Sequence, residues 1–394
     1  MTRTNQHLTR EKMMKLHKRV NLRNILDVFE ETRKNAPSHF SLDSRYGEPI
    51  VFSEKRMGRP YDNSNNSAKN DSCAICEGKT TTVLSYGKSI NDSFPFSNEN
   101  MFPAIIPNGI SLAGPLSELV LKMLGTDSHD SAKGVHLLHW PSNYHIDIHQ
   151  MKRDEVKNML MNIVECENIF ENIDPTTYKY STLIKNTGKV AGGSLEHGHF
   201  QEVISNLPPG YVIDDYIGNC LGIKNPPQIM RESMKGKNPS THVVERHGNF
   251  SIVSPYNAQK PLEQRIICNE PGRNRLADFE EGELGDLACA LIWSTRGLYH
   301  AMPAMGKEFA YNMEINQSPL GEFSIDIFPA TQTRAGLEML GYNICQMTPK
   351  KSANILKLAR SVYSSHPFDK YEISPEKSSG FKEKANRDHD MFFG

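Results

Sequence analysis

Apolar residues recur at helical spacing in four long stretches of the chain. Residues 10–34 predict a helix near the N-terminus, and 151–173 predict the clearest helix of the first half, because Pro175 follows the end of its apolar stripe. In the second half, the same spacing predicts helices over 279–301 and 349–363.

Shorter apolar or alternating runs lie between these stretches and predict strands. They are 133–139, 181–184, 202–204, 241–245, 250–253, 309–315 and 323–328. The runs at 241–245 and 250–253 flank a His247-Gly248-Asn249 turn and predict a hairpin. Each half of the chain therefore contains a strand–helix–strand group, which predicts an α+β fold built from two halves of similar design.

Turn-forming and charged segments divide the chain further. Residues 60–72 are rich in Asn, Ser and Asp and predict a mobile loop, and the prolines and glycines of 206–240 predict a long excursion between the halves. We predict four regions from these patterns. They are a helical extension over 1–40, a first half over 41–210, a second half over 211–370, and a charged, disordered tail over 371–394.

Composition narrows the classes of function. The 394 residues include 45 basic and 46 acidic ones, and this balance argues against a protein that grips nucleic acid through its phosphates. No apolar run is long enough to predict a membrane span, and the N-terminus does not resemble a secretory signal. The odd count of 7 cysteines fits a reducing compartment, and we expect a cytoplasmic protein.

The segment His197-Gly198-His199-Phe200-Gln201 carries the most specific candidate chemistry. On a strand, His197, His199 and Gln201 would share one face. The glycine-rich segment 186–194 precedes it, and such a loop can bring bare backbone N–H groups together around a phosphate. A lone His-x-His is more often structural, but two imidazoles beside an anion-binding loop predict chemistry at phosphorus.

The Cys73-Ala74-Ile75-Cys76 motif has the spacing of two zinc ligands. The same spacing also occurs in redox pairs, usually at a helix start beside a strand, whereas here it follows a polar loop, which favours a metal site. The chain has no second cysteine pair, so histidines are expected to complete the ligand set. The candidates are His136, His139, His145, His149 and His197.

Together these motifs resemble those of the galactose-1-phosphate uridylyltransferases, the transferase branch of the histidine triad superfamily. The resemblance runs over most of the chain in the same order. Residues 45–60 resemble an early strand and an arginine-rich substrate loop, 73–78 a zinc element, 141–145 the stretch with the third zinc ligand, and 186–201 the phosphate loop with its His-Pro-His-x-Gln motif.

The resemblance implies two histidine-triad-like halves, each an antiparallel sheet with packed helices, and a homodimer. It implies Zn²⁺ held by Cys73, Cys76, His145 and His197. His199 would be the nucleophile and Gln201 would hold the transferred phosphoryl group. Substrate contacts would come from Arg56, Arg59, Asn186, Gly192, Gly193, Ser194 and Glu338, with Glu338 binding sugar hydroxyls.

Three departures from the family pattern limit what the resemblance implies. Gly198 replaces the proline between the two histidines. Asn316 and the segment 323–328 lack the histidines of a second metal site, so no iron-type second site is expected. Ile344 replaces a glutamine that contacts the hexose phosphate, so the resemblance does not specify which sugar is the substrate.

The predicted function is a nucleotidyltransferase that forms a covalent nucleotidyl-histidine. It would move a nucleoside monophosphate, UMP by resemblance, between a nucleotide sugar and a sugar 1-phosphate in two displacements with ping-pong kinetics. One alternative keeps the nucleophile but uses inorganic phosphate, as a phosphorylase of a nucleotide sugar or dinucleoside polyphosphate. The other is a non-catalytic, zinc-stabilised RNA-binding or regulatory protein, against which the balanced charge counts.

Overall fold

A computed structural model of the chain describes most of the residues after 132 and several shorter segments before them. The described residues are 39–42, 49–52, 73–80, 83–90, 93–101, 103–104, 110–111, 133–333, 336–339 and 343–363. The predicted helix over 10–34, the predicted loop over 60–72 and the predicted tail over 371–394 lie outside them.

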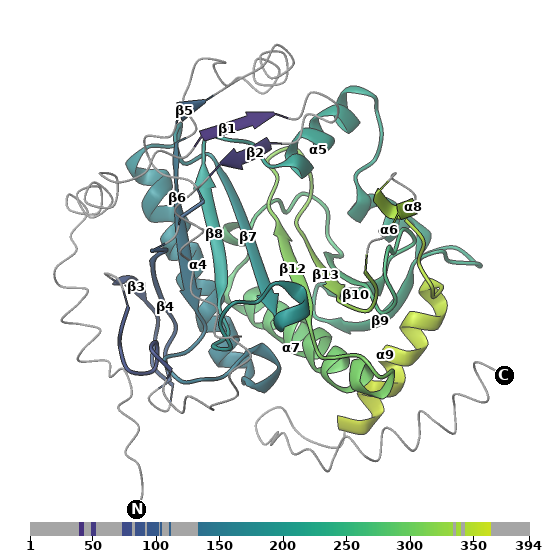
Figure 1. Cartoon of the computed structure of the whole chain (residues 1–394). Coiled ribbons are helices and arrows are strands. Elements are labelled where there is room, and N and C mark those ends of the chain that lie inside the picture. Colours follow the sequence, from purple (N-terminus) through teal and green to yellow (C-terminus); the bar gives the residue numbers. More distant parts are fainter. Residues whose placement is uncertain are drawn as a thin grey trace, which may run out of the picture.

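One large antiparallel sheet crosses both halves of the chain (Figure 1). In the described residues it has 10 strands in the order β3-β4-β6-β8-β7-β12-β13-β11-β10-β9. The first half supplies β3 (Val83–Tyr86), β4 (Phe96–Glu99), β6 (Gly134–Trp140), β7 (Tyr180–Thr187) and β8 (Phe200–Ser205). The second half supplies β9 (His242–His247), β10 (Phe250–Ser254), β11 (Gln264–Cys268), β12 (Tyr311–Asn316) and β13 (Ser324–Pro329).

The two halves repeat one design on either side of the central β7–β12 pair. In the first half, α4 (Arg153–Ile173) connects β6 to β7, and in the second half, α7 (Glu281–Ala304) connects β11 to β12. This confirms the predicted α+β fold with two halves of similar design. Because β7 pairs with β12, the two predicted sheets are joined into one.

The main core lies between this sheet and its helices. The predicted apolar stripe of α4 is buried through Val156, Met159, Leu160 and Ile163, in one cluster with Phe200 of β8 and apolar residues of α7. The last helix, α9 (Pro349–Tyr363), packs against α7. None of the described helices combines the length and the apolar character that a membrane span needs.

A second, smaller sheet belongs to the early part of the chain. It consists of β1 (His39–Leu42), β2 (Pro49–Phe52) and β5 (Ile110–Ser111), in the order β2-β1-β5. β2 falls within the segment 45–60, for which the sequence predicted an early strand.

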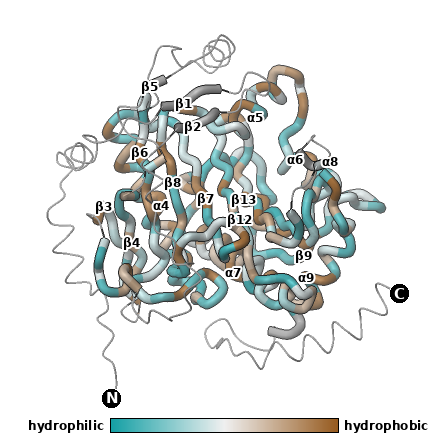
Figure 2. Tube along the Cα trace, in the orientation of Figure 1, coloured by the Kyte–Doolittle hydropathy of each residue, from teal (hydrophilic) through white to brown (hydrophobic). Residues whose placement is uncertain are grey.

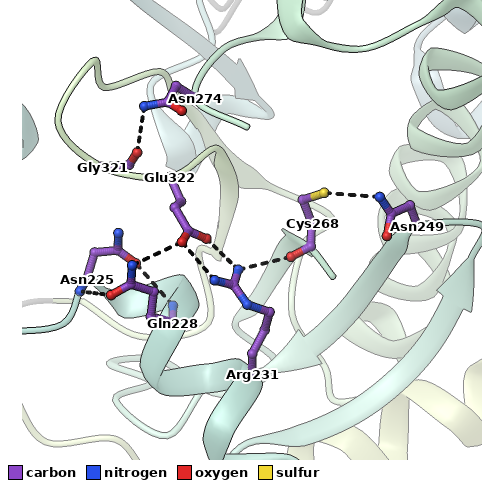
Figure 3. Close-up of polar contacts among 8 residues, drawn as sticks. All are labelled: Asn225, Gln228, Arg231, Asn249, Cys268, Asn274, Gly321 and Glu322. Carbon is purple, nitrogen blue, oxygen red and sulfur yellow. Dashed lines mark hydrogen bonds and ion pairs between the residues drawn. The ribbon is translucent and has the colours of Figure 1, made fainter. Parts of the chain in front are cut away.

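The excursion over 206–240 contains two helices that the sequence did not predict, α5 (Gly210–Cys220) and α6 (Pro226–Ser233). Asn225 caps α6, and Pro226 occupies its first turn, where a proline does not disrupt a helix. In Figure 3, Arg231 of α6 and Gln228 both donate to Glu322 just before β13, at 2.8 and 3.1 Å. The excursion is therefore anchored on the second half.

Hydrophobic residues lie along α5 and the segment that follows it (Figure 2). Ile217, Leu221 and Ile223 are exposed there, whereas Val212 at the start of the same helix is buried. α5 thus packs by its first turn, where Tyr211 donates to the backbone carbonyl of Ser181 on β7 at 2.9 Å.

Behind β8, a polar cluster is buried between the sheet and α4. Glu202 of β8 contacts His139 at 2.8 Å and accepts from Ser181 at 2.6 Å, while Glu167 of α4 accepts from Gln317. Burial and the neighbouring Glu202 carboxylate raise the pKa of Glu167 to about 8, and burial raises the pKa of Glu202 to about 7. Burial lowers the pKa of His139 to about 4, so at neutral pH its ring does not neutralise the pair.

These raised pKa values predict a loss of stability between mildly acidic and mildly alkaline pH. The native state holds the Glu167 and Glu202 protons to higher pH than the unfolded chain does, so the free energy of unfolding falls from the ordinary glutamate pKa of 4.5 up to about 7 to 8, where the native carboxyl groups have also ionised. Each proton by which the two states differ contributes a slope of up to about 1.4 kcal/mol per pH unit. Glu167→Gln should reduce this slope, raising the unfolding midpoint near pH 9 relative to the unsubstituted protein and changing it little near pH 5.

Thermal unfolding followed by circular dichroism across this pH range measures the effect. Glu165→Gln is the matched control, because Glu165 lies on the same helix with an exposed side chain. Equal slopes in the Glu167→Gln variant, the control and the unsubstituted protein would contradict the prediction.

Candidate active site and metal centre

Two cysteines and two histidines from three separate segments form a cluster beside β8. The ligand atoms of Cys73, Cys76, His145 and His197 all lie within 4.8 Å of one another. The cysteines sit in a tight turn closed by Gly78, whose φ of 80° is left-handed and whose N–H donates to the carbonyl of Ile75. The structure thus brings together the four residues that the resemblance implied.

The protonation of His197 fits a metal ligand. Its Nε2 lies 2.9 Å from the backbone carbonyl of Ser142, which can only accept, so the proton is on Nε2 and the lone pair on Nδ1. Nδ1 lies 3.4 Å from the sulfur of Cys73 and 3.6 Å from that of Cys76. A hydrogen bond from Cys76 lowers the pKa of Cys73, and the same contact raises the pKa of Cys76, so the two thiols share a proton that a cation could replace.

The other three histidine candidates lie in different surroundings. His136 accepts from the backbone N–H of Ala104 at 2.9 Å, and His139 faces Glu202. The ring of His149 stacks on Tyr299 with the centroids 4.9 Å apart. The cluster therefore selects His145 and His197 from the five.

His199 is held in one tautomer by the residue two positions before it. Its Nδ1 lies 2.9 Å from the carbonyl of His197, so Nδ1 carries the proton and the lone pair is on Nε2. The rings of His197 and His199 both contact Trp140, with centroids 5.3 and 5.0 Å from that of the indole. A buried imidazole with its lone pair fixed on Nε2 can act as a nucleophile.

The strand prediction for this segment was wrong at its start. β8 begins at Phe200, so of these three residues only Gln201 lies on the strand, and His197 and His199 directly precede it. Gln201 is buried on β8, paired with Leu138 of β6 and Ile184 of β7. Because alternate residues point to opposite faces, Gln201 lies on the face away from Phe200 and the helices.

The face that carries Gln201 continues across the centre of the sheet as a polar surface. Ile184, opposite Gln201 on β7, pairs with Glu314 of β12, and the predicted phosphate contact Asn186 pairs with Asn312. Asn186 and Asn312 are half-buried and Glu314 is exposed. This face therefore carries hydrogen-bonding groups that a polar ligand can use.

The glycine-rich loop is organised differently from its prediction. The N–H groups of Ala191, Gly192 and Gly193 donate to carbonyls of residues 188–189 at 3.0 to 3.2 Å, so the expectation of bare N–H groups is wrong at these positions. The loop is a closed turn, in which Gly192 is left-handed and exposed. Ser194, which follows it, is buried.

The remaining predicted substrate residues are only partly described. Arg56 and Arg59 lie outside the described residues, and Glu338 falls in the short helix α8 (Gly336–Met339), where its side chain is not described. Ile344, where the family has a glutamine, is exposed.

The second-half residues that replace a histidine metal site contact one another. Asn316 donates to Asp326 of β13 at 2.7 Å, and Asp326 is ion-paired with Arg265 of β11. The Asp326 carboxylate is thus neutralised by a cation of the chain itself.

The sequence did not predict three residues around His199. Trp140 packs on both histidines, and Asp147 and Lys185 form a buried ion pair beneath Gly198. A lysine directly after Leu183 and Ile184 of β7, and an aspartate two positions after His145, were the signals in the sequence.

Comparison with known proteins supports the fold. No protein-family model and no curated protein matches the sequence. A uridylyltransferase structure aligns with a TM-score of 0.60 and 20% identity over 82% of this chain and 98% of that one. An ADP-glucose phosphorylase from Arabidopsis thaliana with bound ADP-glucose aligns with a TM-score of 0.56 and 19% identity over 81% and 98%.

A third solved structure agrees with these two. A GalT-like protein from Arabidopsis thaliana aligns with a TM-score of 0.57 and 19% identity over 76% of this chain and 93% of that one. The resemblance drawn from the sequence is therefore confirmed at the level of the fold.

Proposed function

We propose that this chain is a nucleotidyltransferase that carries a nucleoside monophosphate on His199. The observation that carries the proposal is the Nδ1–H of His199 held by the His197 carbonyl at 2.9 Å, which leaves the lone pair on Nε2. The fold, shared with a uridylyltransferase and an ADP-glucose phosphorylase, supports a nucleotide sugar as the substrate.

The first displacement would load His199. Its Nε2 attacks the α-phosphorus of the nucleotide sugar, an N–P bond forms, and the P–O bond to the sugar phosphate breaks with its electron pair on the departing oxygen. The imidazole then carries a positive charge, and the His197 carbonyl stabilises it through the same Nδ1–H hydrogen bond. In the second displacement an acceptor phosphate oxygen attacks, the N–P bond breaks, and the electron pair returns to Nε2. Phosphates leave and attack as anions, so no proton transfer is required.

The substrate contacts follow the predicted residues. Gln201 would hold the transferred phosphoryl group, and Asn186 and Ser194 would contact the substrate phosphates, whereas the N–H groups of Gly192 and Gly193 are already bonded within the loop. Arg56 and Arg59 would supply positive charge to the phosphorus in the transition state. Glu338 would bind sugar hydroxyls.

We also propose that the cluster of Cys73, Cys76, His145 and His197 holds Zn²⁺. Two thiolates and two imidazoles are a common donor set for structural zinc, and all four tetrahedral positions are then taken by the protein. When bound, the ion supplies rigidity and no chemistry at the substrate. His197 would connect the two sites, because its ring reaches the cysteines while its carbonyl accepts from His199.

Two acceptors fit this chemistry. A sugar 1-phosphate makes the protein a transferase, with UMP as the transferred group by resemblance, whereas inorganic phosphate makes it a phosphorylase. One of the structural neighbours is a phosphorylase, and Ile344 stands where the family has a glutamine. Both acceptors, sugar 1-phosphate and inorganic phosphate, should therefore be tested. A homodimer in the cytoplasm stays a prediction of the sequence.

The test is intact-mass spectrometry after incubation with single nucleotide sugars carrying uridine, adenosine or guanosine diphosphate. The protein should gain the mass of one nucleoside monophosphate, and peptide mapping at alkaline pH, where the N–P bond survives, should place it on His199. Exchange of radiolabelled sugar 1-phosphate or labelled inorganic phosphate into the nucleotide sugar then identifies the acceptor. No adduct and no exchange with any member of the panel would favour the non-catalytic zinc-stabilised protein.

A further inference from the structure

A buried ion pair lies directly beneath the turn that carries the proposed nucleophile. Nζ of Lys185, on β7, is 2.9 Å from Oδ1 of Asp147, and the two side chains are 1% and 11% exposed. Burying two charges costs several kcal/mol per ion after relaxation, so such a pair persists only where its geometry is well fixed.

Asp147 contacts the residue just before His199. A Cβ placed on Gly198 would lie 2.7 Å from both Cγ and Oδ1 of Asp147, closer than real Cβ contacts allow. The φ of Gly198 is not positive, so the backbone conformation alone does not require glycine there. Glycine is required because the Asp147 carboxyl group packs against the bare Cα.

Lys185 contacts the residue just after His199. Its Nζ lies over the ring of Phe200, 5.6 Å from the centroid, and Phe200 is itself fully buried in the core. The ion pair therefore touches positions 198 and 200 and brackets His199 between them.

The pair is fixed from both sides. Asp147 accepts from the N–H of Ile148 at 2.6 Å, and its own N–H donates to Gln150 at 2.9 Å in a capping box. Thr187 of β7 donates to the other carboxylate oxygen at 3.4 Å. The ion pair and these three hydrogen bonds together hold Asp147 in one position.

We propose that the Asp147–Lys185 ion pair is a positioning device that fixes the backbone at 198–200 and so aims the imidazole of His199. The inference rests on the proposed function of His199, and it adds residues that touch neither the substrate nor the metal. The pair also connects the segment of His145, two residues before Asp147, to the strand of Asn186, next to Lys185. The ion pair therefore fixes the positions of the proposed metal centre, nucleophile and phosphate contact relative to one another.

The test compares four variants in a single-turnover assay of adduct formation with a nucleotide sugar. Lys185→Met and Asp147→Asn each leave one buried partner unmatched, Asp147→Asn with Lys185→Met removes both charges at similar volume, and Gly198→Ala inserts a methyl group at the point of contact.

We expect the three single variants to lower the rate constant at saturating substrate by about 10- to 100-fold. The substrate concentration at half saturation should stay within about threefold of the value for the unsubstituted protein. The zinc content should differ from that of the unsubstituted protein by no more than about one fifth. The double variant should lose no more than the worse of its two single variants, because the two side chains act as one unit.

The matched control is the partly buried Arg231–Glu322 pair of the second half (Figure 3), which β7 and β12 separate from β8. Glu322→Gln should lower the thermal unfolding midpoint as Asp147→Asn does, but it should leave the rate of adduct formation unchanged.

Three results would overturn the proposal. The first is that the three single variants lower the unfolding midpoint as the control does but keep the rate. The second is that the losses of Lys185→Met and Asp147→Asn multiply in the double variant. The third is that the rate falls in proportion to lost zinc, which would assign the effect to the metal centre. If the unsubstituted protein forms no adduct, the proposed function itself fails, and this is seen before any variant is compared.

Discussion

Replacing His199 with alanine should lower nucleotidyl exchange by about 10⁴-fold or more and abolish the covalent adduct. The buried ring, with its lone pair on Nε2, is the group proposed to form the N–P bond, and an alanine has nothing to take its place. The residual rate would come from binding and charge stabilisation alone. Exchange of labelled acceptor into the nucleotide sugar, measured beside the intact mass, reports both quantities.

A histidine far from the cluster supplies the control for this prediction. His242 lies on β9 at the opposite edge of the sheet, and His242→Ala should keep the exchange rate within about twofold. An adduct of unchanged yield in His199→Ala would place the nucleophile elsewhere. Equal losses in both variants would show that the assay reports stability and not chemistry.

The elements that the sequence predicted well are those whose signal is local. α4 and α7 were predicted because their apolar residues recur at helical spacing over several turns, and burial of that stripe is what holds a helix on a sheet. The hairpin of β9 and β10 followed from its turn. By contrast, the prolines of 206–240 indicated an irregular segment, although Pro226 at a helix start, behind the capping Asn225, is compatible with α6.

In the candidate site, too, the features with a local sequence signal were predicted and those that depend on tertiary packing were not. The spacing of Cys73 and Cys76 indicated a metal site, and the resemblance chose His145 and His197 from five histidines. The pairing of Asp147 with Lys185 could not be predicted, because it depends on how the segment after β6 packs against β7. The closed hydrogen bonds of the glycine loop were missed for a related reason. Glycine permits several turn conformations, and composition does not say which one forms.

The second large effect is expected at the metal centre, where Cys76→Ser should lower bound zinc from about one ion per chain to less than about one tenth. A serine hydroxyl is a poor zinc ligand at neutral pH, and three remaining donors hold the ion weakly. We also expect the thermal unfolding midpoint to fall and adduct formation to slow by about 10- to 100-fold. The rate should depend on the metal because His197 is proposed to bind it through Nδ1, while its carbonyl accepts from His199. Inductively coupled plasma mass spectrometry of the purified protein measures the zinc.

Cys220→Ser separates this effect from the loss of any thiol, since Cys220 is exposed on α5 and its sulfur is not part of the cluster. It should retain both zinc and activity. A Cys76→Ser protein that keeps a full ion would show that the four side chains are not its ligands. One that loses the ion but loads His199 at the original rate would show that the turn is held without metal, and the rigidity assigned to zinc would then have to come from the Asp147–Lys185 pair and from Trp140, which packs on both rings.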